Sequence, residues 1–106
     1  MERRKRRSEK YGEAVRLYLE TVRVKTGVEA LALASEDGLL VAGAGALDLD
    51  WMAAIGAGSK RSRLEWDGHV VHVRRMHVND VRLYIASTGQ PTRDDVAENI
   101  NRILAA

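Results

Sequence analysis

Three histidines are the first residues of this chain whose type and spacing suggest chemistry, namely metal binding. His69, His72 and His77 lie in one segment with alternating apolar residues, a pattern typical of a β-strand. On a strand, His69 and His77 share a face but lie about 26 Å apart, and His72 faces the opposite way. Because no two of them can bind the same ion within this strand, we expect no metal site and three solvated histidines.

The other residues with catalytic potential lack the partners that catalysis needs. The glycines of residues 43–45 and 56–58 are not followed by the Gly-Lys-Ser/Thr sequence with which a phosphate-binding loop opens a helix. The serines have no nucleophile-elbow context and no histidine placed to act as a base. The chain contains no cysteine. We therefore expect a protein without enzymatic activity and without a cofactor.

A basic segment at the N-terminus is the strongest local charge feature. The whole chain has a formal net charge of +2, whereas its first ten residues hold six cations and two anions, so the remainder is slightly acidic. The segment could contact phosphate groups of nucleic acid or of anionic lipid. No aromatic residue interrupts it before Tyr11, so base stacking has no support. The alternative, which we favour, is a disordered, solvated leader over residues 1–8. The cations concerned are Arg3, Arg4, Lys5, Arg6 and Arg7.

Length and composition indicate one small globular domain over residues 9–106. The chain has 106 residues, of which 45% are hydrophobic and 30% are charged, as is usual for a folded soluble domain. No apolar run is long enough for a membrane-spanning helix, and the N-terminus lacks the apolar core of a signal peptide. Together with the absence of cysteine, these features predict a cytoplasmic protein.

The elements that must position any functional residue follow from hydrophobic periodicity. An amphipathic helix is expected over residues 9–26, with Gly27 as its C-cap. A shorter helix is expected over residues 47–57, capped by Asp48 or Asp50 and ended by Gly56 and Gly58. A last helix opens at Thr92 and runs to the end of the chain. The apolar stripe of the first helix consists of Tyr11, Val15, Tyr18, Leu19 and Val22.

Strands are expected between these helices, with turns of characteristic sequence. The turn at Glu36-Asp37-Gly38 joins a hairpin, and Asp67-Gly68 and Asn79-Asp80 join a three-stranded meander. The expected strands are residues 28–35, 39–43, 60–66, 69–78 and 81–88. The predicted fold is therefore α+β: a five-stranded antiparallel sheet sandwiched by three helices, in the order α-β-β-α-β-β-β-α.

The two tryptophans of the chain are predicted to have different roles. Trp51 projects away from the apolar side of its short helix, and an exposed tryptophan is well suited to anchor a protein interface. Trp66 ends a strand just before a turn, where filling the core and binding a partner are both open.

Two local strings resemble the Roadblock/LC7 family. Residues 27–35 (GVEALALAS) and 36–42 (EDGLLVA) are similar to that family's opening, Pro-Gly-Val followed by Ser-x-Asp-Gly-Leu-x-Ile-Ala, with Thr26 where proline is frequent. The order of elements extends the resemblance over residues 9–106. The departure lies in the second helix, which is usually longer and here is shortened by its glycines.

The resemblance implies a fold related to profilin and longin domains, and a homodimer. In such dimers the third strands of two protomers pair at the sheet edge, and the second helices lie side by side across the sheet. Self-pairing would satisfy the free backbone groups of an edge strand, although the charged residues of this strand oppose pairing. The edge residues implied here are Arg61, Arg63, Leu64, Glu65 and Trp66.

The resemblance also implies a partner. Roadblock-like proteins regulate or scaffold Ras-like small GTPases, or serve as adaptors of dynein-type motors, and in the bacterial regulators the second helices form the GTPase platform. We therefore expect a dimer that binds a small GTPase and regulates it in the manner of a GTPase-activating protein, or scaffolds it. The dimer itself is expected to have no enzymatic activity. The open alternatives are a dynein-light-chain-like adaptor and a tether whose basic N-terminus binds anionic lipid or nucleic acid. The platform residues implied here are Leu49, Trp51, Met52 and Ile55.

Overall fold

A computed structural model describes residues 2–58, 61–78 and 80–105, with the backbone alone for residues 2–11. The predicted order of elements is confirmed. The elements are α1 (Glu2–Thr26), β1 (Ala30–Ser35), β2 (Leu40–Gly45), α2 (Leu49–Gly58), β3 (Arg63–Trp66), β4 (His69–Val78), β5 (Val81–Thr88) and α3 (Asp94–Ala105).

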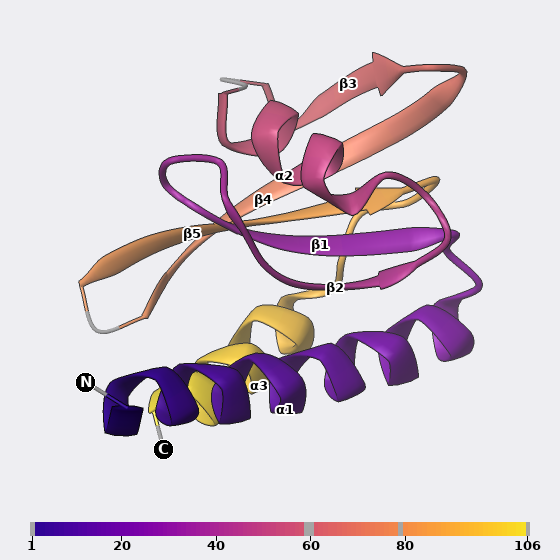
Figure 1. Ribbon diagram of the computed structural model, residues 1–106. Helices are drawn as coiled ribbons and strands as arrows, with labels where there is room; N and C mark the ends of the chain where they lie inside the picture. The colour runs from indigo at the N-terminus through magenta and orange to yellow at the C-terminus, as the bar shows by residue number, and fades with distance from the viewer. Residues whose placement is uncertain (1, 59–60, 79, 106) are drawn as a thin grey trace.

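The five strands form one antiparallel sheet in the order β2-β1-β5-β4-β3, with helices on both faces. Figure 1 shows α1 and α3 side by side beneath the sheet and α2 above it. The α+β sandwich predicted from the sequence is thus confirmed. β2 and β3 are the two edge strands. They differ in that, within the described residues, helix α1 packs along β2 and not along β3.

The turns have the conformations that their sequences predict. Gly38 has φ +83° and donates its N–H to the Ser35 carbonyl (3.0 Å), which closes the β1–β2 turn. Asp67 and Gly68 both have positive φ (48° and 78°), as a two-residue hairpin turn with the right-handed strand twist requires. Because these turns act locally, they set the register of each hairpin.

Each face of the sheet has its own core. Beneath the sheet, α1 and α3 bury a cluster that includes Leu19, Ile85 and Ile100. Above it, a smaller cluster of Ala30, Ala32, Met52, Val71, Val73 and Ala86 lies under α2. Alternation along β4 explains the division, since Val71 and Val73 point upward and Met76 and Val78 point downward.

Several boundaries differ from the sequence prediction. β1 begins at Ala30 instead of Val28, β2 reaches Gly45 instead of Gly43, and α3 begins at Asp94 instead of Thr92. β3 covers only Arg63–Trp66 of the predicted residues 60–66, and residues 59–60 lie outside the described part of the chain. These differences fall at element ends, where the hydrogen bonds of a neighbouring strand or turn decide the boundary.

Helix α1 begins at Glu2, seven residues before the predicted start at Glu9. Arg, Lys and Glu dominate residues 2–10, and these residues have high intrinsic helix propensity, so the helical pattern extends into the basic segment. The side chains of Arg3–Arg7 and of Tyr11 lie outside the described residues, so the role predicted for the basic leader stays a prediction.

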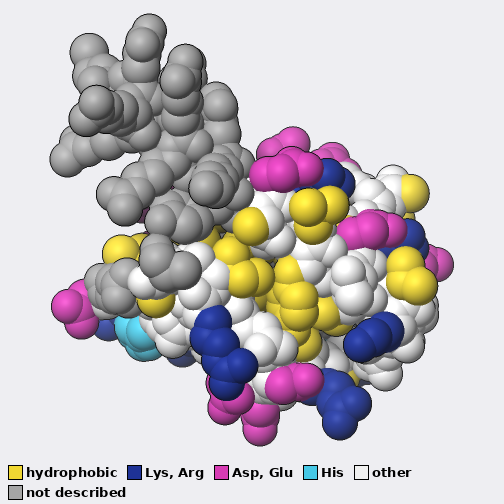
Figure 2. Space-filling model, turned by 90° about the horizontal axis from the view of Figure 1, so that it is seen from below, with side chains coloured by type: hydrophobic (Ala, Val, Ile, Leu, Met, Phe, Trp, Pro, Cys, Tyr) yellow, Lys and Arg dark blue, Asp and Glu magenta, His cyan; other side chains and the backbone are white. Residues whose placement is uncertain are grey.

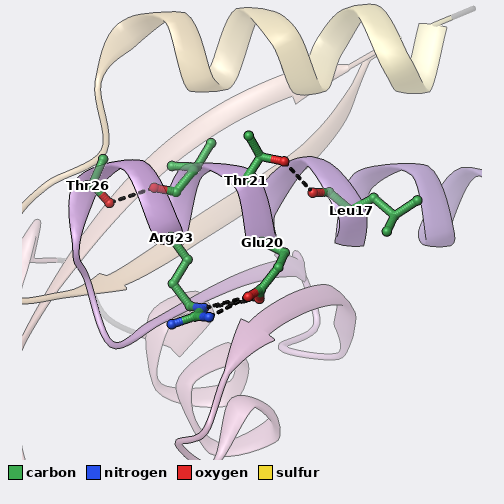
Figure 3. Close-up of polar contacts among 6 residues, drawn as sticks. Leu17, Glu20, Thr21, Arg23 and Thr26 are labelled. Carbon is green, nitrogen blue, oxygen red and sulfur yellow. Dashed lines mark hydrogen bonds and ion pairs between the residues drawn. The ribbon is translucent and has the colours of Figure 1, made fainter.

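Polar contacts along α1 stabilise its second half (Figure 3). Arg23 donates to the carboxylate of Glu20, and the Thr21 and Thr26 hydroxyls donate to carbonyls one turn earlier, at Leu17 and Val22. The hydrogen bond from Arg23 lowers the pKa of Glu20. Because the pKa of Glu20 is lower in the folded chain than its ordinary value, the Glu20–Arg23 pair adds to the stability of the fold at neutral pH. This contribution is lost as the pH falls through the lowered pKa of Glu20.

The outer face of α1 also carries apolar side chains. Figure 2 shows the face formed by α1 and α3, where apolar side chains gather between charged ones. Leu17 and Val24 are 54% and 68% exposed, one on each side of Thr21. No described helix is both long enough and apolar enough to cross a membrane.

Candidate partner-binding surface

The N-cap of helix α2 is one of the two residues predicted from the sequence, Asp48 and Asp50. The Asp48 carboxylate accepts the N–H of Trp51 (3.0 Å), so Asp48 and not Asp50 is the cap. Gly56, predicted to end the helix, lies within it and is buried, and a Cβ at this position would lie 3.5 Å from the Cβ of Ala86. Small residues on both elements thus let α2 pack closely on the sheet.

The four predicted platform residues divide into surface and core. Met52 is fully buried beneath α2, so its place among the partner-contacting residues is wrong: it supports the helix from below. Leu49 and Ile55 are half-buried and pack against the same cluster. Trp51 is 45% exposed and is the large apolar side chain that α2 presents outward.

Trp51 and Trp66 meet above the sheet, a contact that the sequence did not predict. Their ring centroids are 5.2 Å apart with the planes inclined at 45°, and His69 follows at 6.5 Å from Trp66. Trp66, whose role was open, is half-buried and packs against the α2 cluster. Three aromatic rings from α2, β3 and β4 therefore form a continuous row.

A groove opens beside this row. Hereafter called the aromatic groove, it is lined by Ala46, Leu47, Asp48, Trp51, Trp66, Asp67 and His69. Its walls come from the β2–α2 loop, the start of α2 and the β3–β4 turn. At one end, His69 Nδ1 lies 3.3 Å from a carboxylate oxygen of Glu29. The groove thus combines indole rings with carboxylates from separate loops.

Strand β3 lies at an edge of the sheet, as the resemblance to the Roadblock/LC7 family implied. Its alternation is confirmed: Leu64 and Trp66 turn toward α2, and Arg63 and Glu65 are exposed. Arg61, predicted to belong to this edge, lies before the strand begins. β4 pairs with one side of β3, and in the described chain no strand pairs with the other side.

The histidines lie apart, as strand geometry requires. His69 interacts with Glu29, whereas His72 stands opposite Arg63 and His77 opposite Arg82 in the strand register. Within the part of the chain that the structure describes, no three His, Asp or Glu side chains come together as metal ligands.

Comparisons with known proteins identify the architecture. No family model and no curated protein match the sequence. Among solved structures, Myxococcus xanthus MglB superimposes with a TM-score of 0.53, covering 86% of this chain and 84% of its own, at 12% sequence identity. The fold is roadblock-like. At this identity the likeness concerns the fold alone.

Proposed function

We propose that this protein is a cytoplasmic, non-enzymatic homodimer that binds a Ras-like small GTPase through α2 and regulates or scaffolds it. The observation that carries the proposal is the exposed Trp51 in the first turn of α2, the helix on the upper face of a roadblock-like fold. A side chain of this size, half-exposed and seated on a second tryptophan, is typical of the residues that dominate protein interfaces. Ile55, four residues later, is half-buried on the same side of the helix as Trp51, whereas Leu49 lies on the side that packs on the sheet.

The first test replaces Trp51 with alanine. We expect binding to the cognate Ras-like GTPase, loaded with GDP or with a non-hydrolysable GTP analogue, to weaken about tenfold or more, because truncating a central aromatic anchor typically costs about 2 kcal/mol. Biolayer interferometry against the purified Ras-like GTPases of the same genome measures the affinity. The circular-dichroism spectrum of the Trp51→Ala variant is expected to match that of the parent.

Two controls make this result decisive. Leu17→Ala, on the opposite face of the sheet, also removes an exposed apolar side chain and is expected to bind like the parent. A variant lacking residues 1–8 is expected to bind as well. Unchanged affinity of Trp51→Ala would remove α2 as the platform, and loss of all binding on deletion would favour the tether with a basic N-terminus.

The dimer is supported by the charge pattern of β3. In an antiparallel pair of β3 strands with the two-fold axis at Leu64, Arg63 of one protomer stands opposite Glu65 of the other, twice by symmetry. Opposite charges facing across strands are favourable, by about 0.2–1 kcal/mol for each pair. The charged edge residues, which deter pairing with other strands, therefore favour pairing of this strand with itself.

A charge exchange at β3 tests this pairing. Arg63→Glu is expected to raise the dimer dissociation constant about tenfold, because it sets two pairs of carboxylates against each other, and adding Glu65→Arg is expected to restore it. Light scattering after size exclusion, over a dilution series, distinguishes a mass of 11.8 kDa from twice that value. A dimer insensitive to Arg63→Glu, or a monomeric parent, would contradict pairing through β3.

A further inference from the structure

The residues that line the aromatic groove indicate which chemical group of a partner it can bind. We propose that it receives an arginine or lysine side chain from a segment of the partner protein. This inference rests on the proposed function, in which α2 contacts the partner, and it adds the chemical class of the group that is recognised.

The aromatic row is suited to a cation. The electron-rich face of an indole ring attracts guanidinium and ammonium groups more strongly than the other aromatic rings do. Trp51 is 45% exposed, and rings inclined at 45° do not cover each other's faces as parallel rings would. The side of the groove formed by Trp51 and Trp66 can therefore contact the flat face or the methylene stem of a basic side chain.

Two carboxylates line the groove together with these rings. Asp48 comes from the β2–α2 loop and Asp67 from the β3–β4 turn, and both line the groove. Asp48 uses one carboxylate oxygen to cap α2, which leaves the other for a ligand. Among the described residues neither carboxylate is in an ion pair, and neither Lys nor Arg is among the groove's lining residues.

This charge pattern decides between possible occupants. A purely apolar segment would cover the indoles but remove from water two carboxylates that have no ion-pair partner among the described residues, which is costly. An acidic segment would meet like charge. A basic side chain pairs with the carboxylates and contacts the indoles at the same time, so it is the occupant that suits both kinds of group.

The chain supplies a specific probe of this site. Its two tryptophans both line the groove, so their two indole N–H resonances report on this place and on no other tryptophan. The ligand is a nonapeptide of Gly and Ser with three Arg residues, and the matched control carries neutral citrulline at the same positions. We expect the arginine peptide to shift both resonances and the citrulline peptide to leave them unchanged.

A pair of variants tests the charge. Asp67 has φ +48°, a conformation that asparagine adopts readily, so Asp67→Asn removes the charge and keeps the turn. Asp80 has φ +67° in the β4–β5 turn at the other end of the sheet, and Asp80→Asn makes the same change in net charge away from the groove (Figure 1). We expect Asp67→Asn to weaken binding of the arginine peptide three- to tenfold and Asp80→Asn to leave it unchanged.

The outcomes separate this inference from the proposed function. Equal binding of the citrulline peptide, or equal effects of Asp67→Asn and Asp80→Asn, would overturn the cation site, whatever the GTPase measurements show. If the arginine peptide binds as expected while no Ras-like GTPase binds through Trp51, the cation site stands and the proposed function fails.

Discussion

Replacing Gly45 with alanine is expected to lower the free energy of unfolding by about 3 kcal/mol or more, a large part of the roughly 5–15 kcal/mol by which small domains are stable. Gly45 has φ +113°, which side-chain-bearing residues rarely adopt. A Cβ there would lie 2.2 Å from the Glu29 carbonyl oxygen and 2.7 Å from the Ala30 Cα. Because both contacts are with backbone, β1 and β2 would have to move apart.

Gly27→Ala is the matched control for this prediction. Gly27 also has positive φ (77°), but a Cβ at this position would meet nothing within 4 Å. We expect it to cost only the conformational strain, about 1 kcal/mol. Thermal unfolding followed by circular dichroism measures both variants, and the expected fall in Tm for Gly45→Ala exceeds about 10 °C. Similar falls for the two variants would show that the close approach of β1 and β2 at Gly45 is not as described.

Met52→Ala is expected to cost about 2–5 kcal/mol, because Met52 is fully buried between α2 and the sheet and a cavity would remain. Its neighbours in the cluster are mostly alanine and valine, which are too short to fill the space. Urea unfolding at equilibrium measures the loss. Met52→Leu, which conserves volume, is expected to cost less than about 1.5 kcal/mol.

Trp51, the residue next to Met52, is expected to contribute much less to stability because it lies on the exposed side of α2. Trp51→Ala removes a side chain that is 45% exposed, and we expect it to cost about 1 kcal/mol through the lost contact with Trp66. We thus expect Met52 variants to change mainly the stability of the fold, and Trp51 variants to change mainly the affinity for the partner. A Met52→Ala variant as stable as the parent would mean that α2 does not pack on the sheet through this side.

Much of the fold follows from patterns that act over a few residues. The bounds of β4 and β5 agree with the prediction because alternation and the turns at Asp67-Gly68 and Asp80 are local signals. The same holds for the stripe of α1, in which Val15, Leu19 and Val22 are buried as expected. The outward Arg63 and Glu65 also follow from alternation. The edge position of β3 does not: the family resemblance implied it, and the strand order of the sheet shows it.

The surface of α2 was harder to predict because nearly every residue of that helix is apolar. Periodicity nevertheless predicts that Trp51 projects away from the apolar side, and the structure agrees. The grouping of buried Met52 with exposed Trp51 came instead from the resemblance to the Roadblock/LC7 family, which implied a platform without distinguishing the sides of the helix. The local propensity of Gly56 predicts a helix end, but the residue lies inside α2 and faces the sheet, where a Cβ would be in ordinary van der Waals contact with Ala86.

The sequence by itself determined the kinds of elements, their order, the turns between them and the prominence of Trp51, because these depend on neighbours along the chain. Only the tertiary structure decided that Met52 is fully buried and that Trp66, Asp48 and Asp67 join Trp51 in the aromatic groove. These residues come from α2, β3 and two separate loops. Their meeting depends on how closely α2 can approach the sheet, a distance set by the small side chains of Ala30, Ala32 and Ala86 beneath it.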